Sequence, residues 1–223
     1  MKKEDVIEGI SQDTIEIKKK ILATREFYLK TRDIETANFN SEDKITTILL
    51  LNFSFYEKFV KVIYEKAFNF INYLNKKNIF YPKEFDYLNF LYAKIGERNK
   101  KSKIRYFNIY VEKKFLESFD QDKFLSDNKK LSNIEHLIKF NLLILDKKIE
   151  TIKKEFYSPP TQKDEKIEEI LRELSNLYII RNDRIHGNYK EEIINNIERV
   201  TDLFIFSIDV LSNLLIEILE TKF

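Results

Sequence analysis

Three side chains near the end of one apolar helical stripe have the types and spacing needed to handle a phosphate: Arg181, Asn182 and His186. The stripe that contains Leu174 and Leu177 reaches Arg181 at the point where the helical period calls for another apolar residue. A guanidinium stays charged, so it is tolerated there only if it is paired, reaches solvent, or faces a cleft that receives an anion. Arg181 is therefore the first candidate for a functional side chain.

His186 is the second candidate, because imidazole is the side chain that exchanges protons near neutral pH. Asn182 lies four residues before it, on the same helical face, where its amide could fix the orientation of the ring. On an ideal helix Arg181 lies about 140° around the axis from His186. The two converge only if the helix ends early or a second subunit contributes. The alternative interpretation is structural: a polar pair that ends the helix, with His186 stabilised by the helix dipole.

The string from Leu177 to Gly187 (Leu-Tyr-Ile-Ile-Arg-Asn-Asp-Arg-Ile-His-Gly) resembles the Arg-Asn-x-x-x-His motif of HEPN-domain ribonucleases. The resemblance implies an α-helical bundle that cleaves RNA with no metal or other cofactor, in an active site formed across a homodimer. Family members include toxins of toxin–antitoxin pairs, anti-phage abortive-infection proteins and RNA-targeting CRISPR effectors. By this resemblance Arg181 and His186 take the catalytic positions, and Asn182 takes the supporting polar position.

The same resemblance implies an antitoxin or another defence-system protein as a partner. Toxins of the family that a nucleotidyltransferase antitoxin inactivates usually carry His-x-Tyr. Here the tyrosine comes one residue later, as His-Gly-Asn-Tyr with Tyr189. We therefore do not expect such a partner to modify Tyr189.

The chemistry also suits these residue types without reference to the family. Cleavage of RNA through its own 2′-hydroxyl needs a base on that hydroxyl, an acid on the leaving oxygen and positive charge on the phosphorane. A planar guanidinium can hold two phosphate oxygens, and an imidazole can act as base or acid. One motif supplies one histidine for two proton transfers, so the sequence predicts a two-fold dimer with both motifs around one phosphate.

A basic segment with aromatic neighbours is a weaker candidate for RNA binding. Cations there could follow the RNA backbone while Tyr106 and Phe107 stack on bases. Because lysine is abundant throughout the chain, a solvated loop followed by core aromatics is the favoured alternative. Arg184 is likewise either a solvated or a phosphate-positioning residue. The cations of the segment are Arg98, Lys100, Lys101, Lys103 and Arg105.

Composition excludes several other classes. Three glycines and three prolines among 223 residues are too few to supply the turns of an all-β domain. The chain has no cysteine and two histidines, so disulfides, thiolate zinc sites and multi-histidine metal sites are not expected. A net charge of +2 gives no overall signal for nucleic acid or membrane. With no signal peptide and no long apolar run, we expect a soluble cytoplasmic protein.

Helical spacing of apolar residues runs through almost the whole chain and predicts an all-α multi-helix bundle with long antiparallel helices, HEPN-like by the resemblance, in one domain over residues 1–223. The region 1–40 is an N-terminal helix that either packs on the bundle or forms an appendage. The stripe from Ile134 continues to Phe156, which predicts a long helix. The helix over 45–74 carries a second apolar set and should be central in the bundle. That second set is Ile48, Leu51, Phe55, Phe59 and Val62.

Three functions remain open at this point. The first is a metal-independent endoribonuclease that acts as a toxin or anti-phage effector. The second is a non-catalytic HEPN-like module that binds RNA, nucleotide or a protein partner. The third is a structural helical interaction domain.

Overall fold

The computed structural model describes residues 1–34, 41–76, 131, 134–145, 147, 167–185 and 197–223. In these ranges the regular elements are helices: α1 (Lys3–Thr31), α2 (Ser41–Lys76), α7 (Ile134–Leu145), α9 (Ile167–Ile185) and α10 (Ile197–Lys222). This confirms the prediction of an all-α bundle. In α9 the stripe that leads to Arg181 is buried at Ile170, Leu174 and Leu177, and α10 buries a similar stripe that includes Val200, Phe204 and Leu211.

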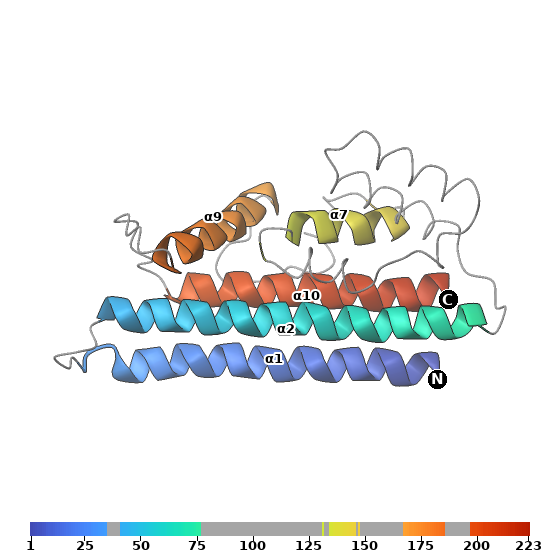
Figure 1. The fold of residues 1–223 in the computed structure, drawn as a ribbon, viewed down its shortest axis with the longest axis horizontal. Helices are drawn as coiled ribbons and strands as arrows, with labels where there is room; N and C mark the ends of the chain where they lie inside the picture. Colours follow the sequence, from blue (N-terminus) through green and yellow to red (C-terminus); the bar gives the residue numbers. More distant parts are fainter. Residues whose placement is uncertain (35–40, 77–130, 132–133, 146, 148–166, 186–196) are drawn as a thin grey trace.

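The three long helices lie side by side, and α1 runs antiparallel to both α2 and α10 (Figure 1). The shorter α7 and α9 lie on the other side of the α2–α10 pair from α1, and both contact α10 (Figure 1). All five helices contribute side chains to one apolar core. The pair formed by α2 and α10 is therefore the platform on which the other helices rest.

Helix α1 belongs to this bundle and is not an appendage. It buries an apolar stripe that includes Ile10, Ile17 and Ile21 against α2 and α10. Lys18 Nζ bonds Asp209 Oδ1 on α10 at 2.8 Å, and Lys66 Nζ on α2 bonds the carboxylate of α1 residue Asp13 at 2.5 Å. These ion pairs tie α1 to both of its neighbours.

Helix α7 is shorter than the sequence predicts. Its stripe is buried from Ile134 to Leu142, but the helix ends at Leu145, and Lys147 is not helical. The Lys147 amide donates to the Leu142 carbonyl at 2.9 Å, the six-to-one bond with which many helices are capped. The later part of the predicted helix, to Phe156, lies outside the described residues.

The central position predicted for the helix over 45–74 is confirmed, although part of the surface of this helix is exposed. Its main stripe, from Ile45 to Leu74, is buried, and α2 contacts α1, α9 and α10. The second apolar set is only partly covered: Ile48 and Phe59 are buried, whereas 42% of Leu51 is exposed and Phe55 is partly exposed.

Candidate functional site

Arg181 lies near the C-terminal end of α9 and continues the apolar stripe of that helix, as the sequence predicts. Leu174 is fully buried and Leu177 nearly so, and Arg181, one turn later, is half-buried. The helix therefore turns a cation toward the bundle at a position where packing alone would favour leucine.

Two aromatic rings support this cation. The Arg181 Cζ atom lies 5.8 Å from the centre of the Phe53 ring on α2 and 5.9 Å from the centre of the Tyr178 ring on its own helix. A guanidinium within about 6 Å of a ring centre is attracted by the negative face of the ring. The two rings also meet each other edge to face at 6.1 Å, so one aromatic corner holds the side chain.

The Phe53 ring that Arg181 contacts is itself fixed by the core. Phe53 is 1% exposed, and its ring packs perpendicular to that of Phe204 on α10, with centres 5.2 Å apart. Phe204 also packs edge to face against Tyr56, one turn further along α2. Three helices thus hold the surface on which the guanidinium rests.

The hydrogen bonds of Arg181 are few. Its Nη1 donates to Oδ1 of the adjacent Asn182 at 2.9 Å, and its Nε is buried without a partner. Among the described residues no carboxylate forms an ion pair with it. Most of the guanidinium N–H groups therefore have no partner among the described residues, on a side chain that still reaches solvent.

The neighbouring arginine on α10 is different. Arg199 Nε donates to Glu173 Oε2 at 2.8 Å, which joins α10 to α9. Partial burial raises the pKa of Asp202 on the next turn, and the charges of Arg25 and Arg199 act in the opposite direction. Arg199 has a carboxylate partner, whereas Arg181 has none among the described residues. The role of Arg199 is therefore to join two helices.

Asn182 makes one hydrogen bond that the structure describes, and this bond is to Arg181. Its Oδ1 accepts the hydrogen bond from Arg181, so in this structure it orients the guanidinium. His186, whose ring we expected Asn182 to orient, lies outside the described residues, and that part of the hypothesis stays a prediction.

The remaining predicted site residues are distributed as follows. Arg184 lies in the last turn of α9. Tyr189 lies outside the described residues, and so does the whole basic segment of Arg98, Lys100, Lys101, Lys103 and Arg105.

The course of α9 bears on how Arg181 and His186 could meet. The helix is continuous through Ile185, so no early end or break between Arg181 and Ile185 turns the chain. Of the two routes to convergence, an end of the helix before Ile185 is excluded, and the contribution of a second subunit stays a prediction.

The sequence does not predict a role at this site for Phe53, because its spacing marks it only as part of the buried stripe of α2. Tyr178 precedes Arg181 by three residues, a spacing at which helical neighbours touch, so a local signal for it exists. Phe53 is remote in sequence and belongs to another helix, so only the packing of α9 on α2 reveals its contact with Arg181.

Two further observations concern the described part of the chain as a whole. None of its helices is long and apolar enough to cross a membrane. Nowhere in these ranges do three histidine, cysteine, aspartate or glutamate side chains gather closely enough to hold a metal ion.

Comparison with known proteins gives no relative. The sequence matches no protein-family model, and neither a curated protein nor a solved structure is significantly similar to it.

Proposed function

We propose that this protein is a metal-independent endoribonuclease of HEPN type that acts as a toxin or anti-phage effector. The proposal is supported by the Arg-Asn-x-x-x-His string and by the environment of Arg181. The single observation that carries it is a half-buried guanidinium on an aromatic corner, without a carboxylate partner among the described residues.

In this proposal Arg181 holds the scissile phosphate. Its N–H groups lie in one plane and can donate to two phosphate oxygens at once. Phe53 and Tyr178 take rotational freedom away from the side chain before RNA arrives, so the cost of ordering it is met during folding. As negative charge builds up on the phosphorane, the fixed guanidinium stabilises it.

His186 carries the proton transfers. The 2′-oxygen attacks phosphorus as a base removes its proton, and the bond from phosphorus to the 5′-oxygen breaks as an acid protonates that oxygen. The products are a 2′,3′-cyclic phosphate and a 5′-hydroxyl. Two transfers with one histidine in each copy of the motif call for a homodimer, in which His186 of each subunit faces the Arg181 of the other.

The test is an RNA cleavage assay in EDTA with the full chain, comparing wild type with Arg181→Ala and His186→Ala. We expect both variants to lose at least about 100-fold in rate, which is typical when one group that stabilises transition-state charge is removed. The ends of the products should be 2′,3′-cyclic phosphate and 5′-hydroxyl. Equal cleavage by His186→Ala means that the activity is a contaminant.

Two other outcomes decide between the alternatives. RNA binding without cleavage favours the non-catalytic module. A monomeric mass in sedimentation under conditions of full activity rules out the shared site.

A further inference from the structure

The outer side of α1 carries an apolar stripe outside the core. Ile15, Leu22 and Leu29 recur every seven residues, so Ile15 and Leu29 each lie about 20° from Leu22 around the helix axis. Ile15 is 55% exposed, and Leu22 and Leu29 are partly exposed. None of the three belongs to the apolar core of the described chain or packs against it. A stripe with a period of seven on an open helix face is typical of a helix that pairs with another helix.

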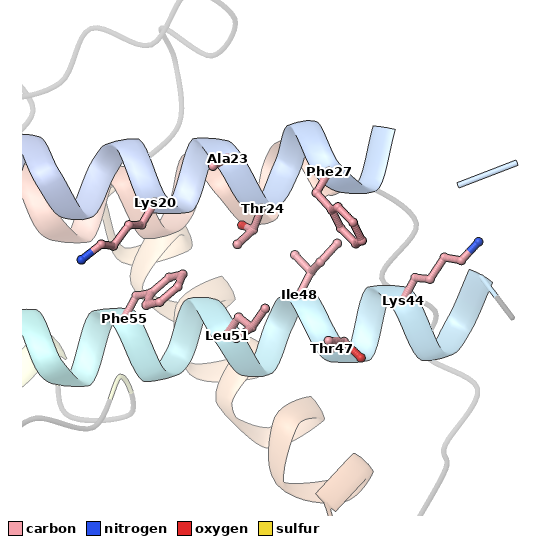
Figure 2. Close-up of a pocket in the computed structure, with 9 residues that line it drawn as sticks. All are labelled: Lys20, Ala23, Thr24, Phe27, Lys44, Thr47, Ile48, Leu51 and Phe55. Atoms are coloured by element: carbon pink, nitrogen blue, oxygen red, sulfur yellow. The ribbon is translucent and has the colours of Figure 1, made fainter. Parts of the chain in front are cut away.

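Other sides of α1 face its neighbours in the bundle. The buried stripe, which includes Ile17 and Ile21, lies about 100–140° from Leu22 and packs against α2 and α10. Toward α2 there is also a groove of about 430 Å³ (Figure 2). Lys20 and Thr24, which line this groove from α1, lie about 160° from Leu22. The outer stripe is therefore separate from both the core and the groove.

Two charged side chains of opposite sign border the stripe on one side. Glu26 and Lys19 lie about 40° and 60° from Leu22 in the same direction around the helix, and both are exposed. They are about 10 Å apart along the axis, so they do not pair with each other. The ion pairs of α1 in the described structure belong to other residues. Both charges are thus available to a partner.

We propose that the outer stripe packs antiparallel on the same stripe of a second copy of this chain, with a two-fold axis at Leu22. An antiparallel partner reverses the order of residues about the axis, so Ile15 of one copy meets Leu29 of the other. Lys19, three residues before Leu22, then lies beside Glu26, four residues after it. An axis perpendicular to the helices keeps both charges on one side of the stripe, and two such ion pairs form.

The charges select this orientation. A parallel pair in register would place Lys19 against Lys19 and Glu26 against Glu26, which repel. The cations on the other side of the stripe, Lys18 and Arg25, each have a carboxylate nearby on α10 of their own subunit. Lys18 Nζ bonds Asp209 at 2.8 Å. Partial burial raises the pKa of Asp202, and the nearby charge of Arg25 opposes this rise.

This contact is small and differs from the shared active site proposed above. From Ile15 to Leu29 it extends about 21 Å along the helix, so we expect the weak self-association of a transient interface. Helices α1 and α9 lie on opposite sides of the α2–α10 pair (Figure 1), so the contact does not bring Arg181 of the two copies together. The inference does not rest on the ribonuclease activity, and its test uses no RNA.

The test is disulfide cross-linking of the full chain, which has no cysteine of its own. Under mild oxidation Leu22→Cys should form a cross-linked dimer at least about tenfold faster than the matched control Ile15→Cys. On the two-fold axis the facing α-carbons come within the roughly 4–7 Å that a disulfide spans, whereas two copies of residue 15 are about 21 Å apart. Ile15 is 55% exposed, so random collision favours no slower reaction there. Circular dichroism checks that both variants are folded.

A second arm tests the ion pairs in the Leu22→Cys background. Glu26→Lys turns both pairs into repulsions and should slow cross-linking about tenfold. Adding Lys19→Glu restores both pairs with their signs exchanged and should return the rate to within about threefold of the background. Phe27→Glu is the control for the groove, because Phe27 lines it and is 59% exposed. It should change the rate by less than about twofold.

Three results overturn the proposal. Cross-linking of Leu22→Cys no faster than that of Ile15→Cys means either a parallel pair or random collision, and in the second case the stripe is open to a different protein. A rate that stays low when Lys19→Glu is added to Glu26→Lys means that the two charges do not meet. An equal slowing by Phe27→Glu and Glu26→Lys places the contact at the groove instead.

Discussion

Helices α7 and α9 pack on the same pair of long helices, yet they bring very different polar groups to α2. From α7, the fully buried Asn141 donates through Nδ2 to the Tyr64 hydroxyl at 2.6 Å. From α9, the half-buried Arg181 lies against the Phe53 ring, and within the described part of the chain its one hydrogen bond is to its neighbour Asn182. The first contact is a neutral hydrogen bond, and the second is a cation that α2 does not neutralise.

The difference indicates what each contact is for. A buried neutral hydrogen bond adds modest stability and fixes the position of one helix on another, because leaving either group unpaired is costly. Both contacts leave one polar atom buried without a partner, Asn141 Oδ1 and Arg181 Nε, but only Arg181 carries a charge, and a cation without a described carboxylate partner is a poor way to gain stability where a leucine would pack. We infer that the α7 contact serves folding and that the α9 contact serves binding and catalysis, and this division can be tested.

The largest expected change in stability comes from the α7 contact. Tyr64→Phe leaves Asn141 Nδ2 buried without its acceptor and should lower the free energy of unfolding by about 2 kcal/mol, measured in urea. Asn141→Leu together with Tyr64→Phe should recover at least half of this loss, since the Asn141 amide is then no longer buried without its acceptor. RNA cleavage should stay within twofold throughout. A stable single variant, or one that has lost activity, would contradict the division.

High pH should destabilise the same region. Burial raises the pKa of both Tyr56 and Tyr64 above the ordinary value near 10. Above that pH the unfolded chain releases these protons first, so stability is full below pH 10 and falls by up to about 1.4 kcal/mol per pH unit for each tyrosine. Urea unfolding between pH 9 and 11.5 measures the slope, which should be shallower in Tyr64→Phe. An identical slope would show that Tyr64 does not contribute.

A smaller effect is expected from the aromatic support of Arg181. Phe53→Leu removes one of the two rings and should lower kcat/KM for RNA about fivefold, equivalent to about 1 kcal/mol. The matched control is Phe59→Leu, because Phe59 is also a buried phenylalanine of α2 but is not one of the two described rings that hold Arg181. Both variants should lose similar stability, and only the first should lose activity. Equal activity losses would mean that the ring acts through stability alone.

The smallest effect is expected for Asn182. Asn182→Ala removes the described hydrogen bond of the guanidinium and should raise KM by about threefold, with the pH profile of kcat unchanged. Asn176→Ala, an exposed position on the same helix, should have no effect. A shifted pH profile with an unchanged KM would instead support the sequence-based hypothesis that Asn182 orients His186.

Much of the fold follows from local sequence patterns. Stripes such as Ile170, Leu174 and Leu177 predict both the helix and its buried face, because the helical period alone decides which side chains share a side. The end of α7 at Leu145 was not predicted, because the apolar spacing continues beyond it and offers no signal for the cap at Lys147.

The candidate site, like the fold, is predicted only in part by the sequence. That Arg181 would be a charged residue on an apolar stripe follows from the sequence, and the structure confirms it. That Phe53 would support it depends on how α9 lies across α2, and contacts between residues so far apart in the chain leave no trace in one sequence. The exposure of Leu51 was missed for the same reason, since apolar spacing predicts a buried side chain without showing whether a neighbour covers it.

The most direct test of the division between α7 and α9 is Arg181→Met, assayed in parallel for urea unfolding and for RNA cleavage in EDTA. Methionine is unbranched and flexible, so it can still pack against Phe53 and Tyr178, but it removes the charge and the unpaired Nε. We predict an unfolding free energy equal to or above that of wild type, with cleavage reduced at least about 100-fold. A loss of more than about 2 kcal/mol in stability, or cleavage at the wild-type rate, would contradict a functional role for the cation.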